Sequence, residues 1–216
     1  MILSKPDIRD YCDKKKLVTP WKDERIEPSS YDLTFDGQYY YYQKSDGVAP
    51  RVQIVKDDED LQIPADAICF VMTKETVTMP NNIAGQISLK LGLILKGVML
   101  SNHPPIDPGY SGKIVGMLHN LSDRPVSIPK GSHILSIVFH QLSTSLEPKD
   151  AYHGKHQGLT QLRDCVNEVL RGSVARLAED LKKSNSRFLS FFPSMMVLVT
   201  VIIAVLTIIV GIKALK

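Results

Sequence analysis

The sequence predicts a mainly β fold, either a sandwich or a barrel, for residues 26–145. This region contains short runs of branched and aromatic residues, such as residues 67–79 and 83–89. Pro, Gly, Asn and Asp separate the runs at short intervals, which is typical of all-β domains. The last part of the chain has a different, uncharged composition and predicts a membrane helix.

The first 16 residues predict a short helix. Ser4 is placed to cap it, and Pro6 falls early in the first turn, where proline is tolerated. The segment does not resemble a secretory signal peptide, because it is charged early and has no sufficiently long apolar run.

Strand-length runs follow the predicted helix. Residues 132–142 alternate only imperfectly between apolar and polar, as expected for a strand that is buried on both faces. Tyr39 to Tyr42 would alternate between the two faces of a strand. They favour an aromatic sheet edge or a subunit contact over stacking on bases. The runs include residues 37–44, 49–55, 67–79, 83–89, 112–121, 126–129 and 132–142.

The apolar period changes at residue 159 and predicts an amphipathic helix over residues 159–187. Its narrow stripe suits either a coiled coil or packing back onto the β domain, and the sequence leaves both open. Gly172 is a weak point within it. The stripe consists of Leu159, Leu162, Val166, Leu170, Val174, Leu177 and Leu181.

Residues 188–212 contain no charged side chain. About 20 apolar residues cross a bilayer as a helix, because the backbone must satisfy its own hydrogen bonds there. Only four residues follow, so we expect a single-pass tail anchor. Lys182, Lys183 and Arg187 favour a cytoplasmic N-terminal domain. The expected organisation is therefore a domain over residues 1–158, an amphipathic segment over 159–187 and a membrane helix over 188–212.

Composition argues against two classes of function. The formal net charge of +3 is too small to indicate a nucleic-acid-binding surface. Cys12, Cys69 and Cys165 lie far apart and form no Cys-x-x-Cys pair, so we expect neither a zinc site nor a disulfide framework.

Several segments, in order, resemble dCTP deaminases of the dUTPase superfamily over about residues 1–160. The segments are MILSKPDIRDYCDKKKLV, RIEPSSYDLTF, PNNIAGQI, IDPGYSGKI, HNLSDRPVSIPKG, HILSIVFHQL and AYHGKHQGL. The resemblance implies a dUTPase-like distorted β-barrel of the β-clip type. It also implies a homotrimer with sites between subunits, a deoxynucleotide ligand of the dUTP, dCTP or dTTP class, and Mg²⁺ carried on the triphosphate.

Asp107 is the candidate catalytic residue. It lies in a tight turn formed by Pro108 and Gly109, and hydrolysis at a phosphate needs a carboxylate to activate water. From the residues alone, a turn-forming aspartate is the alternative. The resemblance implies that Asp107 activates the water and that Tyr110 lies under the deoxyribose. It also places Asp32 near the phosphate or metal, in either a structural or a direct role.

The catalytic and phosphate-binding motifs depart from the family pattern. Met117 stands where the deaminases carry a catalytic glutamate, and methionine cannot carry a proton. In the phosphate motif, Lys90 replaces an arginine and Leu91 replaces a serine, while Gly92 still fits. Lysine keeps the charge but loses the bidentate geometry of arginine. Lys96 offers a second cation.

Two further segments complete the expected nucleotide-binding set. Ser136 replaces a glutamine that supports the site in the family. Residues 154–158 form either a short lid, with Lys155 and Gln157 reaching the nucleotide, or a simple linker.

Three functions remain open at this point. The first is a membrane-anchored protein that binds deoxynucleoside triphosphates through a degenerate catalytic site, as a sensor or pseudoenzyme. The second is an active nucleotide hydrolase, for which a Mg²⁺-dependent dUTP diphosphatase is favoured over a dCTP deaminase. The third is a trimeric membrane-bound scaffold without a ligand.

Overall fold

The computed structural model describes residues 1–41, 52–56, 59–101 and 103–165. The chain divides into residues 1–170 and 171–216, and the second unit lies wholly outside the described residues. The boundaries expected near residues 158 and 187 therefore remain predictions.

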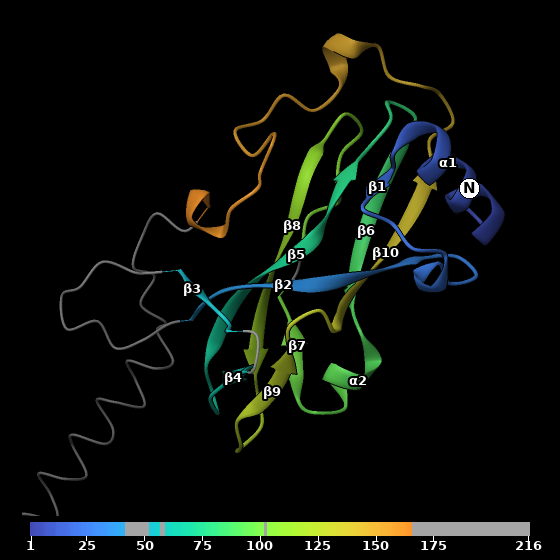
Figure 1. Cartoon of the computed structure of the whole chain (residues 1–216). Helices are drawn as coiled ribbons and strands as arrows, with labels where there is room; N and C mark the ends of the chain where they lie inside the picture. The colour runs from blue at the N-terminus through green and yellow to red at the C-terminus, as the bar shows by residue number, and fades with distance from the viewer. Residues whose placement is uncertain (42–51, 57–58, 102, 166–216) are drawn as a thin grey trace, which may run out of the picture. The chain divides into compact units, whose positions relative to one another are not determined.

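The regular secondary structure of the described residues is mainly strand, as the sequence predicted (Figure 1). The helices are α1 (Lys5–Lys15) and α2 (Leu91–Ile94), with short 3₁₀ turns at Asp23–Arg25, Pro148–Asp150 and Leu162–Asp164. The strands are β1 (Val18–Thr19), β2 (Tyr31–Tyr41), β3 (Gln53–Ile54), β4 (Asp60–Ile63), β5 (Ile68–Thr78), β6 (Ile83–Leu89), β7 (Val98–Leu100), β8 (Ser111–Asn120), β9 (Val126–Pro129) and β10 (His133–Gln141).

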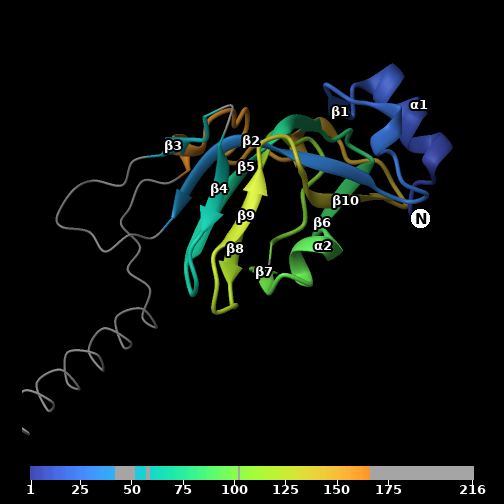
Figure 2. The same cartoon turned by 60° about the horizontal axis from the view of Figure 1, so that its bottom comes forward.

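One antiparallel sheet carries most of the structure. Its strands run in the order β6-β10-β2-β5-β8-β7, while β1 pairs with β5 and β3 pairs with β2. The end strands β6 and β7 contact each other, so the sheet curls into a nearly closed barrel. Strands β4 and β9 form a separate two-stranded sheet, which Figure 2 shows side by side.

The barrel encloses a core of apolar side chains. Strand β8 alternates regularly, with every second residue from Gly112 to Asn120 buried and the others half-buried. Strand β10 differs from the expectation of two buried faces. Leu135, Ile137 and Phe139 are buried, whereas the opposite face from Ser136 onward is only half-buried. Its pattern is imperfect because Ile134 and Leu135 are buried in succession where the pairing with β2 shifts register, and because apolar Val138 lies on the half-buried face.

Helix α1 confirms the predicted N-terminal helix. The Ser4 hydroxyl donates to Asp7 Oδ2 at 2.5 Å, and the Ser4 backbone N–H donates to the same oxygen at 3.0 Å. This local cap explains why the helix begins directly after Ser4. Ile8 and Cys12 are buried and anchor the helix to the core.

A buried charged network joins β2 to β5. Glu75 is fully buried and accepts a hydrogen bond from Arg25 Nη1. It also accepts from the Thr34 backbone N–H at 2.8 Å and from the Thr34 hydroxyl at 2.7 Å. These three donors compensate the carboxylate for its removal from water.

The helix predicted from residue 159 does not begin there. Leu159 forms a parallel bridge with Gly112 of β8, and only a 3₁₀ turn follows at Leu162–Asp164. Leu159 and Leu162 are buried in a cluster with Tyr40 and Met72. The two leucines are therefore apolar because they cover the barrel, not because they begin a free helical stripe.

The other predictions for the C-terminal part concern residues outside those that the structure describes. These are the stripe from Val166 onward and the membrane span over residues 188–212. Within the described part of the chain, no helix is both long enough and apolar enough to cross a bilayer.

Candidate functional site

The turn that carries Asp107 lies between β7 and β8 and is held by backbone hydrogen bonds. Ile106 exchanges two such bonds with Gly85, at 2.8 and 2.9 Å. The Gly109 N–H donates to Met79 O at 3.0 Å, and the Tyr110 N–H donates to Asp107 O at 3.2 Å. The Asp107 side chain is exposed and has no hydrogen-bond or ionic partner among the described residues. Its carboxylate is therefore available to a ligand.

A cavity of about 290 Å³ opens beside this turn. Asp107 is the single carboxylate among the described residues that line it. Tyr110 and Tyr152 meet edge to face within it, with ring centroids 5.6 Å apart. The lining consists of His103, Pro104, Pro105, Ile106, Asp107, Tyr110, Lys113, Ile114, Val115, Tyr152, His156, Leu159 and Cys165. An apolar wall with a few polar groups is the usual form of a small-molecule site.

Tyr110 is held rigidly in the wall of this cavity. Its hydroxyl donates to Lys113 O at 2.7 Å, and burial raises the pKa of the phenol. The Tyr110 hydrogen is therefore already engaged, and the ring offers the ligand an apolar surface. This placement suits the role beneath a sugar that the resemblance implies.

Residues 151–159 fold back over the Asp107 turn. Gln157 Oε1 accepts from the Ser111 N–H at 3.0 Å, and Gln157 Nε2 donates to Gly109 O at 3.0 Å. Two backbone hydrogen bonds also attach the segment to β8: the Gly158 N–H donates to Ser111 O, and the Lys113 N–H donates to Leu159 O. Lys155 is exposed and does not line the cavity.

Gly109 offers a test of how tightly this segment packs. It has φ of +85°, and an added Cβ would lie 2.7 Å from Ala151 Cβ and 3.0 Å from Tyr152 N. Gly131 has a similar φ of +81° but open space around the added atom. We expect Gly131→Ala to cost about 1–2 kcal/mol of unfolding free energy for the backbone conformation. Gly109→Ala should cost about 1–3 kcal/mol more through overpacking.

Urea unfolding of the two glycine variants measures this difference. Equal losses of stability would mean that residues 151 and 152 move aside without cost, and would contradict the close packing of the segment on the turn.

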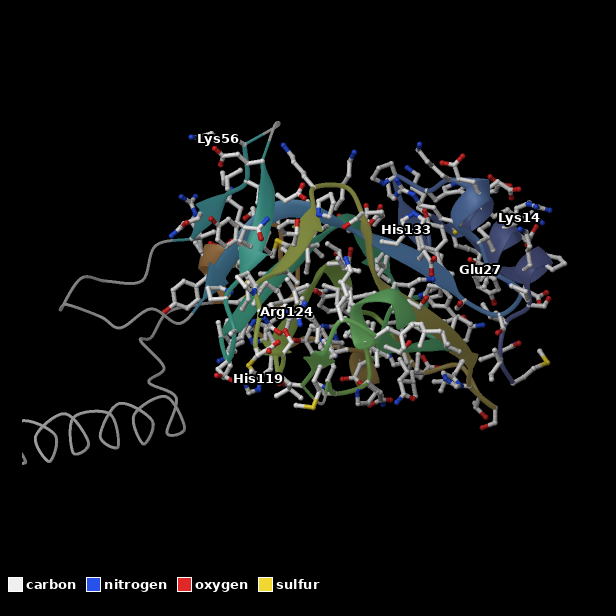
Figure 3. All side chains as sticks on the ribbon, turned by 90° about the horizontal axis from the view of Figure 1, so that it is seen from below. Lys14, Glu27, Lys56, His119, Arg124 and His133 are labelled. Carbon is white, nitrogen blue, oxygen red and sulfur yellow. The ribbon has the colours of Figure 1, made fainter. Side chains whose placement is uncertain are left out.

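Three other predicted site residues, Asp32, Lys90 and Ser136, converge at a second place. His133 joins them there, and these four residues are called the Asp32 cluster. Asp32 is buried, and its Oδ2 accepts from Lys90 Nζ at 2.6 Å. Its Oδ1 accepts from the Ser136 hydroxyl at 2.5 Å. His133 Nδ1 lies 3.3 Å from Asp32 Oδ2, and Figure 3 labels this histidine. Ser136 thus turns its hydroxyl to a carboxylate within the chain.

The Asp32 cluster does not line the cavity beside Asp107. Gly92 lies on α2, and a Cβ added there would meet no atom within 4 Å. Within the described residues, a larger side chain would therefore fit at this position. Lys96 is exposed just beyond α2 and also lies outside the cavity lining. The described chain therefore brings Asp107, Tyr110 and Gln157 together, and separately gathers Asp32, Lys90 and Ser136.

Sequence reasoning missed a cation in the cavity wall. Lys113 Nζ donates to Asp36 Oδ2 at 2.9 Å, and both side chains are largely buried. Asp36 also accepts from the Gln38 backbone N–H at 2.7 Å and from Gln38 Nε2 at 2.8 Å. The sequence shows Asp36 and Gln38 two residues apart, where a predicted strand begins. Lys113, the partner of Asp36, lies 77 residues away, and no local pattern connects the two.

Met117 lies on the face of β8 that also carries Lys113 and Val115. It pairs with Phe70 of β5 and does not line the cavity beside Asp107. His119 shares this face, as expected from strand alternation. Figure 3 labels His119 at the end of β8.

Comparison with known proteins assigns the family. The model of the dCTP deaminase-like family matches residues 2–142. The dCTP deaminase of Pyrococcus horikoshii is 28% identical over 149 residues, covering 69% of this chain and 89% of the relative. The dUMP-forming dCTP deaminase of Pseudarthrobacter chlorophenolicus is 30% identical over 176 residues, covering 73% of this chain and 91% of the relative. The chain therefore belongs to the dCTP deaminase-like family.

A solved structure agrees with the fold. The 2′-deoxycytidine 5′-triphosphate deaminase from Agrobacterium tumefaciens superimposes with a TM-score of 0.55 at 16% identity. The alignment covers 69% of this chain and 50% of that chain, so the present chain spans half of its length. At this identity the likeness shows the fold alone.

Proposed function

We propose that the protein binds deoxynucleoside triphosphates of the dUTP, dCTP or dTTP class in the cavity beside Asp107. The observation that carries this proposal is the rigid turn that presents an unpaired Asp107 carboxylate beside the Tyr110 ring. The carboxylate can accept from a sugar hydroxyl or a water, and the ring can pack against the sugar. The family membership and the dCTP named for several relatives support the same ligand class.

We further propose that the catalytic site is degenerate for deamination. Water adds to cytosine and ammonia leaves, so a side chain must move protons between them. Met117 has no titratable atom, and residues 110–122 contain no glutamate that a shift of register could supply. Binding without deamination is the role of a sensor or pseudoenzyme.

Mg²⁺ would enter on the nucleotide phosphates. The described residues contain no cluster of three or more His, Cys, Asp or Glu side chains that could hold a metal ion by themselves. The exposed Asp107 carboxylate fits a Mg²⁺ that keeps its phosphate and water ligands, because Mg²⁺ prefers oxygen donors. When bound, the ion would neutralise phosphate charge.

A second candidate function is a dUTP diphosphatase, favoured by the exposed and unpaired Asp107. A carboxylate in this state can position water and take its proton, and this hydrolysis requires no residue at Met117. The third function that the sequence left open, a scaffold without a ligand, requires that the cavity bind no nucleotide.

The complete site is proposed to form between subunits of a homotrimer. Lys90, the expected phosphate contact, belongs to the Asp32 cluster and lies outside the Asp107 cavity within one chain. Leu91, Leu95, Met99 and Leu121 are exposed apolar side chains near α2 and β7, and burial by a second copy would stabilise them. A neighbouring copy would then bring its own Lys90 toward the cavity.

We also propose that residues 188–212 anchor the protein to a membrane, with the barrel in the cytoplasm. The support is the uncharged stretch and the basic residues before it. Fractionation of cells that express the full chain, followed by alkaline extraction, tests this location. Release of the protein into the alkaline supernatant would contradict an integral anchor.

Nucleotide titration and product analysis of the full chain test the proposed function. We expect saturable binding of dUTP, dCTP or dTTP in the presence of Mg²⁺, with no conversion of dCTP to a uracil nucleotide. Pyrophosphate and dUMP formed from dUTP would establish the diphosphatase instead. Absence of binding by all three nucleotides would reject both and leave the scaffold.

A further inference from the structure

Lys113 is the one cation of the cavity wall, among the described residues, that is itself held by a buried carboxylate. Its side chain is 20% exposed, and that of Asp36 is 7% exposed. A lysine ammonium has three N–H donors and no acceptor. Asp36 takes one donor, and no other described residue accepts from Lys113 Nζ. Two donors of a partly buried cation are therefore left for whatever enters the cavity.

The position of Lys113 is set by two strands of the barrel. Asp36 and Gln38 lie where the pairing of β2 with β5 shifts register, and Lys113 lies beside a corresponding shift between β5 and β8. Such bulges re-aim side chains next to functional sites. In the sheet, β5 lies between β2 and β8 and pairs with both; Figure 1 labels the three strands.

Gln38 connects this ion pair to the segment that closes the cavity. Its amide nitrogen donates to Asp36, and its Oε1 accepts from the Leu162 N–H at 3.0 Å. Both ends of the Gln38 amide are therefore occupied. Asp36 cannot turn away from Lys113 without losing these bonds, so the ammonium is pre-oriented before a ligand arrives.

The size and lining of the cavity indicate which part of a nucleotide faces Lys113. A volume of about 290 Å³ is at the small end of ligand pockets, which suits a base with its sugar. The walls are largely apolar, with Ile106, Ile114 and Val115 among them. A triphosphate is strongly hydrated and would remain outside such walls, so an enclosed donor meets the base.

We propose that Lys113 is a specificity-determining residue, which selects a pyrimidine with a keto group over one with an amino group at the same position. This inference rests on the proposed nucleotide-binding function and names its preferred substrate class, uracil or thymine nucleotides. The ammonium donates to the keto oxygen. The amino group of cytosine is itself a donor, so the two Lys113 donors that Asp36 does not take would find no acceptor there.

The test compares the α,β-imido analogues of dUTP and dCTP, which resist hydrolysis, by calorimetric titration of the full chain with Mg²⁺. The two analogues carry the same phosphates and sugar and differ only in the base. We expect the unmodified chain to prefer the dUTP analogue by about tenfold or more, the range of one charge-assisted hydrogen bond. Lys113→Met should abolish the preference, and Lys113→Arg should retain it.

Two further variants control for the loss of a surface charge and for a failure of Lys113→Met to fold. Lys74→Met changes an exposed lysine on β5 and should leave the preference unchanged. If Lys113→Met does not fold, the double variant Asp36→Asn with Lys113→Met removes both charges together and should also lose the preference. Thermal unfolding of each variant checks the fold.

The possible failures are distinguishable. If the unmodified chain binds neither analogue, the proposed function fails and this inference fails with it. If it binds and Lys113→Met weakens both analogues equally, or weakens neither, Lys113 does not read the base and only this inference is overturned.

Discussion

Glu75→Gln is expected to lower the free energy of unfolding by about 3–5 kcal/mol, the usual cost of removing one partner of a buried ion pair. The carboxylate accepts from Arg25 and twice from Thr34 in a site without solvent access. In the Glu75→Gln variant an NH₂ group would replace one of the two carboxylate oxygens. That NH₂ would face an N–H or O–H of Arg25 or Thr34, so two donors would meet and at least one hydrogen bond would be lost. Arg25 also keeps a charge without a counterion.

Denaturant unfolding of the full chain, followed by fluorescence of Trp21, provides the measurement. The matched control is Asp23→Asn, which removes the carboxylate partner of Arg9 in an exposed pair at 2.6 Å. Water screens this second pair, so we expect little change. The double variant Arg25→Met with Glu75→Gln should lose less stability than the sum of its single changes. Similar losses for Glu75→Gln and Asp23→Asn would show that burial does not determine the energy.

Asp107→Asn is the second large effect, and it separates the two nucleotide functions. If the full chain releases pyrophosphate from dUTP, the variant should lower that rate by about 10²–10⁴-fold, the contribution of a positioned general base. Asparagine has nearly the same size, and the turn is held by backbone hydrogen bonds, so nucleotide affinity should change far less than the rate.

Rates at saturating dUTP and Mg²⁺, together with binding of the imido analogue, distinguish these effects. Asp150→Asn provides a control at an exposed carboxylate of the same type outside the cavity lining. An unchanged rate in Asp107→Asn would remove this residue from the chemistry. A chain that binds dUTP but releases no pyrophosphate would instead favour the sensor or pseudoenzyme.

Local features of the fold could be predicted from the sequence because neighbouring residues determine them. Ser4 and Asp7 are three residues apart and cap α1 by themselves. The turn at Asp107 depends on Pro108 and on Gly109, whose positive φ other residues rarely adopt. Strand composition predicted most of the long strands, although the run over residues 37–44 begins six residues after β2 does. It missed β1, β4 and β7. These short strands are stabilised by pairing with β5, β9 and β8, respectively, rather than by their own residues.

The family resemblance predicts Asp32, Lys90 and Ser136 as site residues, but it does not predict which side chains they contact. Their hydrogen bonds join β2 to β10 and to the start of α2, and they depend on how the strands are aligned. A change of one residue in register would turn each side chain to the other face. The same limit explains why the spacing of Leu159 and Leu162 predicts a helix that the structure does not form at these residues.

The sequence by itself determined the mainly β class, the N-terminal helix, the Asp107 turn and the family resemblance, because each depends on residues close together or on several motifs in order. Only the tertiary structure decided that Lys113 meets Asp36, that Glu75 meets Arg25 and that Gln157 attaches to the Asp107 turn. Each contact joins residues distant in the chain. Side-chain charge and size allow such contacts, but strand register and the path of the backbone select which of them form.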